Sequence, residues 1–145
     1  MSDWSKFAAE RVQRRTLDAG QKDTQDAQDE NFLNSNAPRM WAEFRELVIQ
    51  MSTDLNAESG MHGRLAHNKS DPNALKIEDT EMRMTTAVTF NPERHEIKIG
   101  GLAGSGKLYK LAVTPGTHEI RFTAGGSAVP VDKIAQGVLE SLLGI

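Results

Sequence analysis

The strongest hydrophobic pattern in the chain lies between residues 40 and 55. Its apolar residues follow one another at three- and four-residue intervals, which places them on one face of a helix. They are Met40, Phe44, Leu47, Val48, Met51 and Leu55. We expect this helix to begin at Asn36 or Ala37 and to end near Asn56. Pro38 fits its first turn, because the backbone N–H that proline lacks would be unpaired there in any case.

A shorter helical pattern opens the chain, and Asp3 can cap a helix over about residues 4–18. The apolar residues of this first helix are Trp4, Phe7, Ala8 and Val12. Residues 18–31 contain almost nothing to bury, so they form either a solvated helix extension or a mobile linker. The sequence thus predicts a helical N-terminal region over residues 1–57 with a polar, linker-like segment at 18–35.

Four aromatic residues of these two helices form a candidate interface. They are Trp4, Phe7, Trp41 and Phe44. They can pack inside the monomer, in an antiparallel helix pair, or they can meet across a dimer, because a wide apolar surface left in water tends to be covered by a partner.

Beyond a polar segment at residues 58–73, which has the composition of a loop, polar and apolar residues alternate. Alternation with a period of two indicates strands with one buried face. Five strands are predicted, with inward residues Leu75 and Ile77; Met82, Met84, Thr86, Val88 and Phe90; His95, Ile97 and Ile99; Tyr109, Leu111 and Val113; and His118, Ile120 and Phe122. Their short connections favour an antiparallel meander.

The last predicted element is an amphipathic helix over about residues 131–143, entered through Pro130 and followed by Gly144. The predicted fold class is therefore α+β: N-terminal helices, a five-stranded antiparallel β-meander, and a C-terminal helix packed on one face of the sheet. Residues 73–145 and the second helix are expected to form one compact domain.

A glycine-rich stretch at residues 101–108 resembles the phosphate-binding motif G-x-x-x-x-G-K-[ST], but Leu108 occupies the position of the hydroxyl residue that holds magnesium. The alternation after Lys107 also predicts a strand where that motif needs a helix. We expect a hairpin loop, with weak anion binding at Gly104, Gly106 and Lys107 as an alternative. Nucleotide binding is a remote possibility.

Two histidines, His95 and His118, share the inward parity of their strands and are expected half-buried at the rim of the sheet. With Tyr109 they are candidate ligand-binding residues, provided that a cavity separates the sheet from the C-terminal helix. No carboxylate at a suitable spacing completes a general acid–base pair. We therefore predict no catalytic residues, no metal site and no cofactor.

Composition narrows the function further. The 145 residues carry a net charge of −3 and no cysteine, which excludes disulfides and thiolate chemistry. Glutamates are interleaved with the lysines and arginines of the outward sheet face, and this face has no aromatic residue for base stacking, so nucleic-acid binding is not expected. No apolar run reaches bilayer length, which predicts a cytoplasmic protein without a membrane partner.

From these observations we predict a non-enzymatic interaction protein. It acts through self-association or through docking of its N-terminal helices on a partner protein. The alternative is a small-molecule-binding domain with its cavity under the C-terminal helix.

Overall fold

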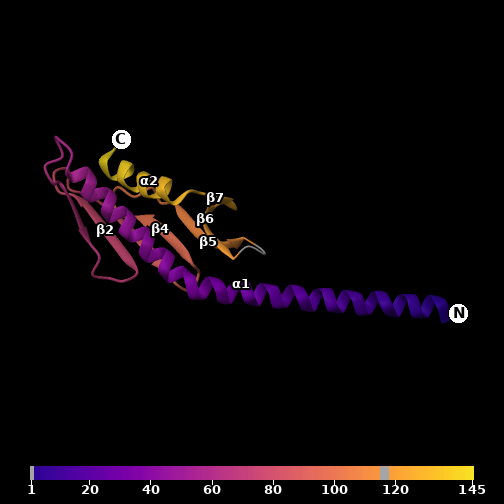
Figure 1. Ribbon diagram of the computed structural model, residues 1–145. Coiled ribbons are helices and arrows are strands. Elements are labelled where there is room, and N and C mark those ends of the chain that lie inside the picture. The colour runs from indigo at the N-terminus through magenta and orange to yellow at the C-terminus, as the bar shows by residue number, and fades with distance from the viewer. Residues whose placement is uncertain (1, 115–117) are drawn as a thin grey trace.

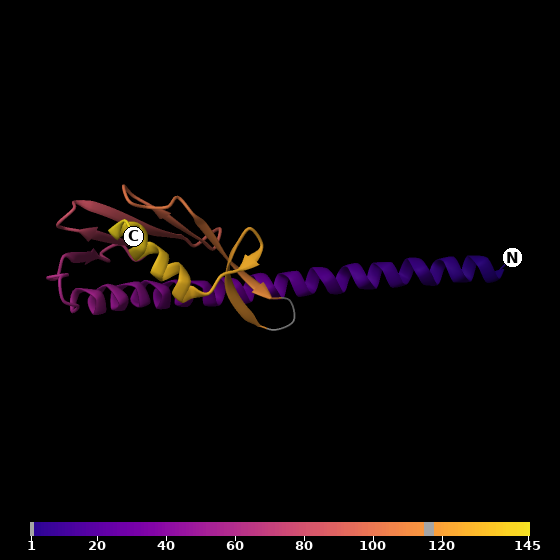
Figure 2. The ribbon, with the colours of Figure 1, turned by 90° about the horizontal axis from the view of Figure 1, so that it is seen from above.

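The computed structural model describes residues 2–114 and 118–145, including all of their side chains except those of residues 2 and 21–23. A single helix, α1 (Ser2–Asn56), is followed by an antiparallel sheet and a second helix, α2 (Val131–Leu143). The N-terminal half of α1 projects far from the sheet, whereas the C-terminal half of α1 lies along the sheet (Figures 1 and 2). The α+β class is confirmed.

Helix α1 is one continuous helix and not the two N-terminal helices predicted, and the polar segment is the helix extension that the sequence left open beside a linker. Polar side chains in this segment support the helix locally. Gln25 Nε2 donates to Asp29 Oδ1 at 2.9 Å, and Thr24 Oγ1 donates to the carbonyl of Gly20 at 2.9 Å. The missing apolar stripe therefore shows that nothing covers the segment, but it does not end the helix.

Pro38 lies inside α1 and does not begin a helix. A proline in a helix interior removes one hydrogen bond and clashes with the preceding turn, so it bends the helix. Figure 1 shows that α1 changes direction where it reaches the sheet, and Pro38 accounts for this bend.

The sheet is a meander in which each strand pairs with the next one along the chain, in the order β1-β2-β3-β4-β5-β6-β7. All six pairings are antiparallel. The strands are β1 (Leu65–Asn68), β2 (Ala74–Asp79), β3 (Met84–Asn91), β4 (Glu96–Gly100), β5 (Leu108–Thr114), β6 (Glu119–Ala124) and β7 (Ser127–Ala128).

The described residues form seven strands where the sequence predicts five. Strand β1 lies in the segment expected to be a loop, and it buries only Leu65, so it shows no alternation to detect. Strand β7 has two residues, both exposed. Both extra strands lie at the edges of the sheet, where little side-chain burial is needed to add a strand.

One face of the sheet forms the core with α1 and α2. Its inward residues include Leu75, Val88, Ile97 and Leu111, all fully buried. Met82 is an exception to the predicted inward set, because it lies in the turn before β3 and its side chain is 65% exposed. The outward face carries exposed polar residues, so the sheet is covered on one side only.

Helix α2 has the predicted bounds, and it ends at Gly144 in the left-handed conformation. It packs against α1 and against β2 and β3. No helix within the described residues carries an apolar stretch long enough to cross a membrane.

Candidate functional site

The projecting half of α1, defined here as residues 2–32, is the most unusual surface of the molecule. The first buried side chain along the described part of the helix is Leu33. Before it, four large apolar side chains are mostly in water: Trp4 (75% exposed), Phe7 (58%), Val12 (64%) and Leu17 (67%). Trp4 and Phe7 are three residues apart and lie on one side of the helix, whereas Val12 and Leu17 point to other sides.

The structure separates the four aromatic residues of the predicted interface into two pairs. Trp41 and Phe44 are buried, where Trp41 stacks on Phe90 at 5.6 Å between ring centroids and Phe44 lies 5.6 Å from the ring of Phe122. Trp4 lies 37 residues before Trp41 on the same helix, a separation of about 55 Å at 1.5 Å per residue. The two pairs therefore do not meet within one chain.

Charge is segregated along the projecting half. Residues 6–15 hold four basic residues and one acidic residue (net +3), whereas residues 18–30 hold one basic and five acidic residues (net −4). Arg11 lies over the ring of Phe7 at 5.7 Å, so the basic block and the aromatic residues share one surface. No ion pair within the described residues uses Arg11, Arg15, Asp26 or Asp29.

An apolar groove of about 490 Å³ lies farther along α1, between this helix, β6 and the entry to α2. Met40 and Leu47 form its α1 side, and Ile120 and Val129 lie opposite. Trp4 and Met40 are 36 residues apart, which is ten turns at about 3.6 residues per turn. By this count Trp4 and Met40 have the same helical phase, with the bend at Pro38 between them.

The glycine-rich segment forms a hairpin loop between β4 and β5, as predicted, and β5 rather than a helix follows Lys107. Its backbone N–H groups are engaged inside the protein. Ala103 N–H donates to Thr85 O at 2.8 Å, Gly104 N–H to Gly101 O at 3.2 Å, and Gly106 N–H to Ile99 O at 2.9 Å. Lys107 N–H donates to Ser105 Oγ at 3.3 Å. An anion would have to displace these bonds.

This loop has a packing role. Ser141 Oγ of α2 donates to Ala103 O at 2.5 Å. A Cβ on Gly104 would lie 2.1 Å from Gly100 O, so the loop backbone needs glycine there. The glycines therefore follow from a tightly folded loop that supports the end of α2.

The predicted ligand-binding residues do not form one site. The Leu111 N–H donates to His95 O at 2.8 Å, and Leu111 pairs with Phe122, four residues from His118. Four residues of strand separate the two histidines by about 13 Å along the strand direction, and β5 lies between their strands, so their distance is larger still. His95 is buried beside the strand that carries Tyr109, whereas His118 is exposed and its ring lies 5.2 Å from that of Phe32.

The space that a ligand was expected to fill, under α2, is occupied by apolar side chains of the helix. Ile134, Ala135, Val138, Leu139 and Leu142 are all buried there. A second hollow, of about 390 Å³, lies between α1 and α2 and includes Met51 and Leu143 in its lining.

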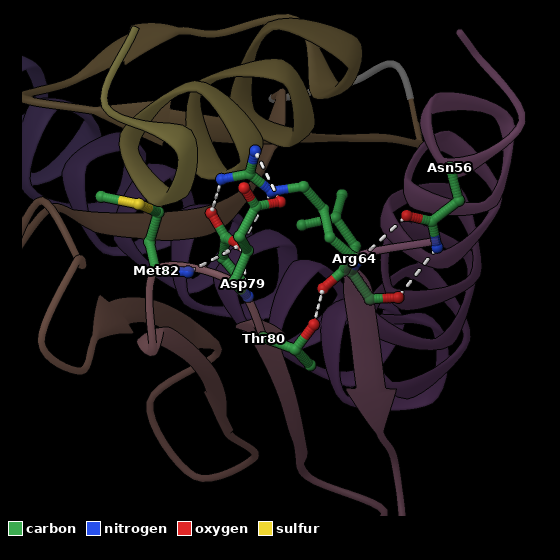
Figure 3. A network of polar contacts seen from close by, with 7 residues as sticks. Asn56, Arg64, Asp79, Thr80 and Met82 are labelled. Carbon is green, nitrogen blue, oxygen red and sulfur yellow. Dashed lines mark hydrogen bonds and ion pairs between the residues drawn. The ribbon is translucent and has the colours of Figure 1, made fainter. Parts of the chain in front are cut away.

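Sequence reasoning missed an ion pair at the start of the sheet, between Arg64 and Asp79 (Figure 3). Arg64 Nε donates to Asp79 Oδ1 at 2.8 Å and Nη2 to Oδ2 at 2.5 Å, and the N–H groups of Glu81 and Met82 donate to Oδ1. The hydrogen bond from Arg64 outweighs the burial of the carboxylate and holds the pKa of Asp79 below its usual value.

The same corner is fixed by Asn56 at the end of α1. Its side chain accepts the N–H of Leu65 at 2.9 Å and donates to the carbonyl of Leu65 at 2.8 Å, which ties β1 to α1 (Figure 3). A signal for the ion pair was present in the sequence, because Asp79 continues the inward set of Leu75 and Ile77. A carboxylate at an inward position needs a cationic or N–H partner.

No protein-family model, curated protein or solved structure matches this chain.

Proposed function

We propose that this protein is a non-catalytic interaction protein whose projecting half of α1 docks on another protein chain. The observation that carries the proposal is the exposure of Trp4 and Phe7 on a helix that extends beyond its own domain. An aromatic side chain buries 150–250 Å² when covered, so two of them supply anchors for a partner.

The globular part supports this role as a rigid base. Arg45 Nη1 donates to the carbonyls of Asp71 and Pro72 at 3.2 and 3.1 Å, and Trp41 Nε1 donates to Pro72 O at 2.8 Å. These contacts fix α1 to the β1–β2 connection. The ion pair between Arg64 and Asp79 likewise stabilises the fold, because it joins the start of β1 to the end of β2. This structural role favours binding over catalysis. A cytoplasmic location remains a prediction.

Site-specific photo-crosslinking in cells of the native organism tests the proposal. A benzophenone side chain is placed at Phe7. A matched control carries it at Gln13, six residues farther along the helix and on the side opposite Trp4. We expect an adduct from position 7 and little from position 13, because only the first lies on the aromatic surface. Equal or absent adducts at the two positions would contradict docking through this helix.

A further inference from the structure

The distribution of charged and apolar residues along the projecting half indicates which partner it would bind. We propose that a second copy of this protein covers it, with the two helices antiparallel and a two-fold axis near Gly20. The inference rests on the proposed function and names its partner. It follows from how charge and apolar groups are distributed along one face of α1.

That face is a stripe at helical spacing that includes Trp4, Arg11, Arg15, Asp26 and Asp29. Apart from Lys22, its basic residues lie before residue 18, and its acidic residues lie after residue 17. In a parallel dimer each arginine would face the arginine of the other copy, which is destabilising. In an antiparallel dimer the basic block of each copy faces the acidic block of the other.

A two-fold axis near residue 20 gives a definite register, because residue i then lies opposite residue 40 − i or 41 − i. Arg11 of one copy lies opposite Asp29 of the other, and Arg15 lies opposite Asp26. These pairs form twice by symmetry. Among the described residues these four side chains form no ion pair, and Asp29 accepts one hydrogen bond, from Gln25 Nε2, which leaves its second carboxylate oxygen for the arginine.

The same register completes the apolar contacts at both ends. Phe7 arrives opposite residues 33 and 34, beside Phe32, which is only partly buried in the single chain. Trp4 arrives opposite residues 36 and 37, about one turn before Met40, where the apolar groove along α1 begins. The aromatic end of each projecting half is thereby covered by the body of the other copy, and the two bodies lie at opposite ends of the paired helices.

Distance measurements between spin labels test the arrangement, and the absence of cysteine allows single-cysteine labelling of the full chain. Ala9→Cys, Thr16→Cys and Ala27→Cys place labels away from the stripe. The antiparallel register predicts axial separations of about 33, 12 and 21 Å at these sites, at 1.5 Å per residue. A parallel dimer would give the same separation at all three sites, and this result would overturn the proposal.

Charge reversal provides the second arm. We expect Arg11→Glu with Arg15→Glu to weaken dimerisation by about 100-fold, and Asp26→Lys with Asp29→Lys to do the same. The variant with all four changes restores opposite charges across the antiparallel seam, and its affinity should return to within about tenfold of the original. Light scattering over a concentration series gives the dissociation constants, and an unchanged melting temperature of the globular part shows that folding is intact.

Failure of this inference can be told from failure of the proposed function. A strictly monomeric chain, or a four-residue variant that stays monomeric, would overturn the second copy as partner. If position 7 then still crosslinks to a different protein and position 13 does not, docking through the projecting half stands with another partner. If neither position forms an adduct, both proposals fall.

Discussion

The two halves of α1 belong to one helix but meet opposite environments. From Leu33 onward, one face of the helix packs against the sheet, and Ala37, Phe44 and Val48 are almost completely buried. Before Leu33, the same helix carries Trp4 and Phe7 into water. Both halves are helical. Burial, and not helix formation, therefore distinguishes the structural part of α1 from the part available to a partner.

The largest expected difference between the halves appears when a phenylalanine is truncated in each. Phe44→Ala should lower the free energy of unfolding by about 3–5 kcal/mol, because it leaves a cavity against Phe122. Phe7→Ala should change it by less than about 0.5 kcal/mol, because its ring is already in water. Urea unfolding followed by Trp41 fluorescence in a Trp4→Phe background measures both. A large loss from Phe7→Ala in the monomer would mean that the projecting half belongs to the core.

A carboxylate in each region gives the next contrast. Asp79→Asn should lower the free energy of unfolding by about 2 kcal/mol, because charge-assisted hydrogen bonds from Arg64 are weakened in a buried site. Glu10→Gln, on the exposed projecting half, is the matched control and should leave stability unchanged.

The pH dependence has a definite sign. The pKa of Asp79 is lower in the folded protein than its usual value of 3.8. Its contribution is therefore fully present above that value and is lost as the pH falls through the folded pKa. Melting temperatures measured downward from pH 6 should fall less steeply for Asp79→Asn than for the original chain. Parallel curves would contradict this role for Asp79.

Much of the packed region could be predicted from the sequence, because burial imposes a period on it. Helix α2 and the inward residues of β2, β4 and β5 follow from alternation or helical spacing alone. The single-helix nature of α1 could not be predicted, because the described side chains of residues 18–31 pack against no other element and carry no periodic signal. Pro38 added to the error, since a proline near the start of an apolar stripe is also typical of a first turn.

The burial of individual candidate residues is harder to predict from the sequence than the fold. Trp4, Phe7, Trp41 and Phe44 all fit helical apolar patterns, but the buried environment of Trp41 and Phe44 depends on strands far away in sequence. The register that separates His95 from His118 is likewise a property of the assembled sheet. The inward position of Asp79 carried a usable signal, but its partner Arg64 lies in a segment without any pattern.

The smallest expected effect compares glycines in two helices. An added methyl group meets no atom within 4 Å at Gly20 in α1 or at Gly137 in α2, so alanine should favour the helix by up to about 1 kcal/mol at either site. Gly137→Ala should raise the free energy of global unfolding, because α2 is part of the core. Gly20→Ala should instead slow amide hydrogen exchange near residue 20 by up to about fivefold and leave the urea midpoint of the globular part unchanged. If Gly20→Ala raised that midpoint as much as Gly137→Ala, the projecting half would unfold together with the domain, and the division of α1 into a packed base and an independent docking arm would be wrong.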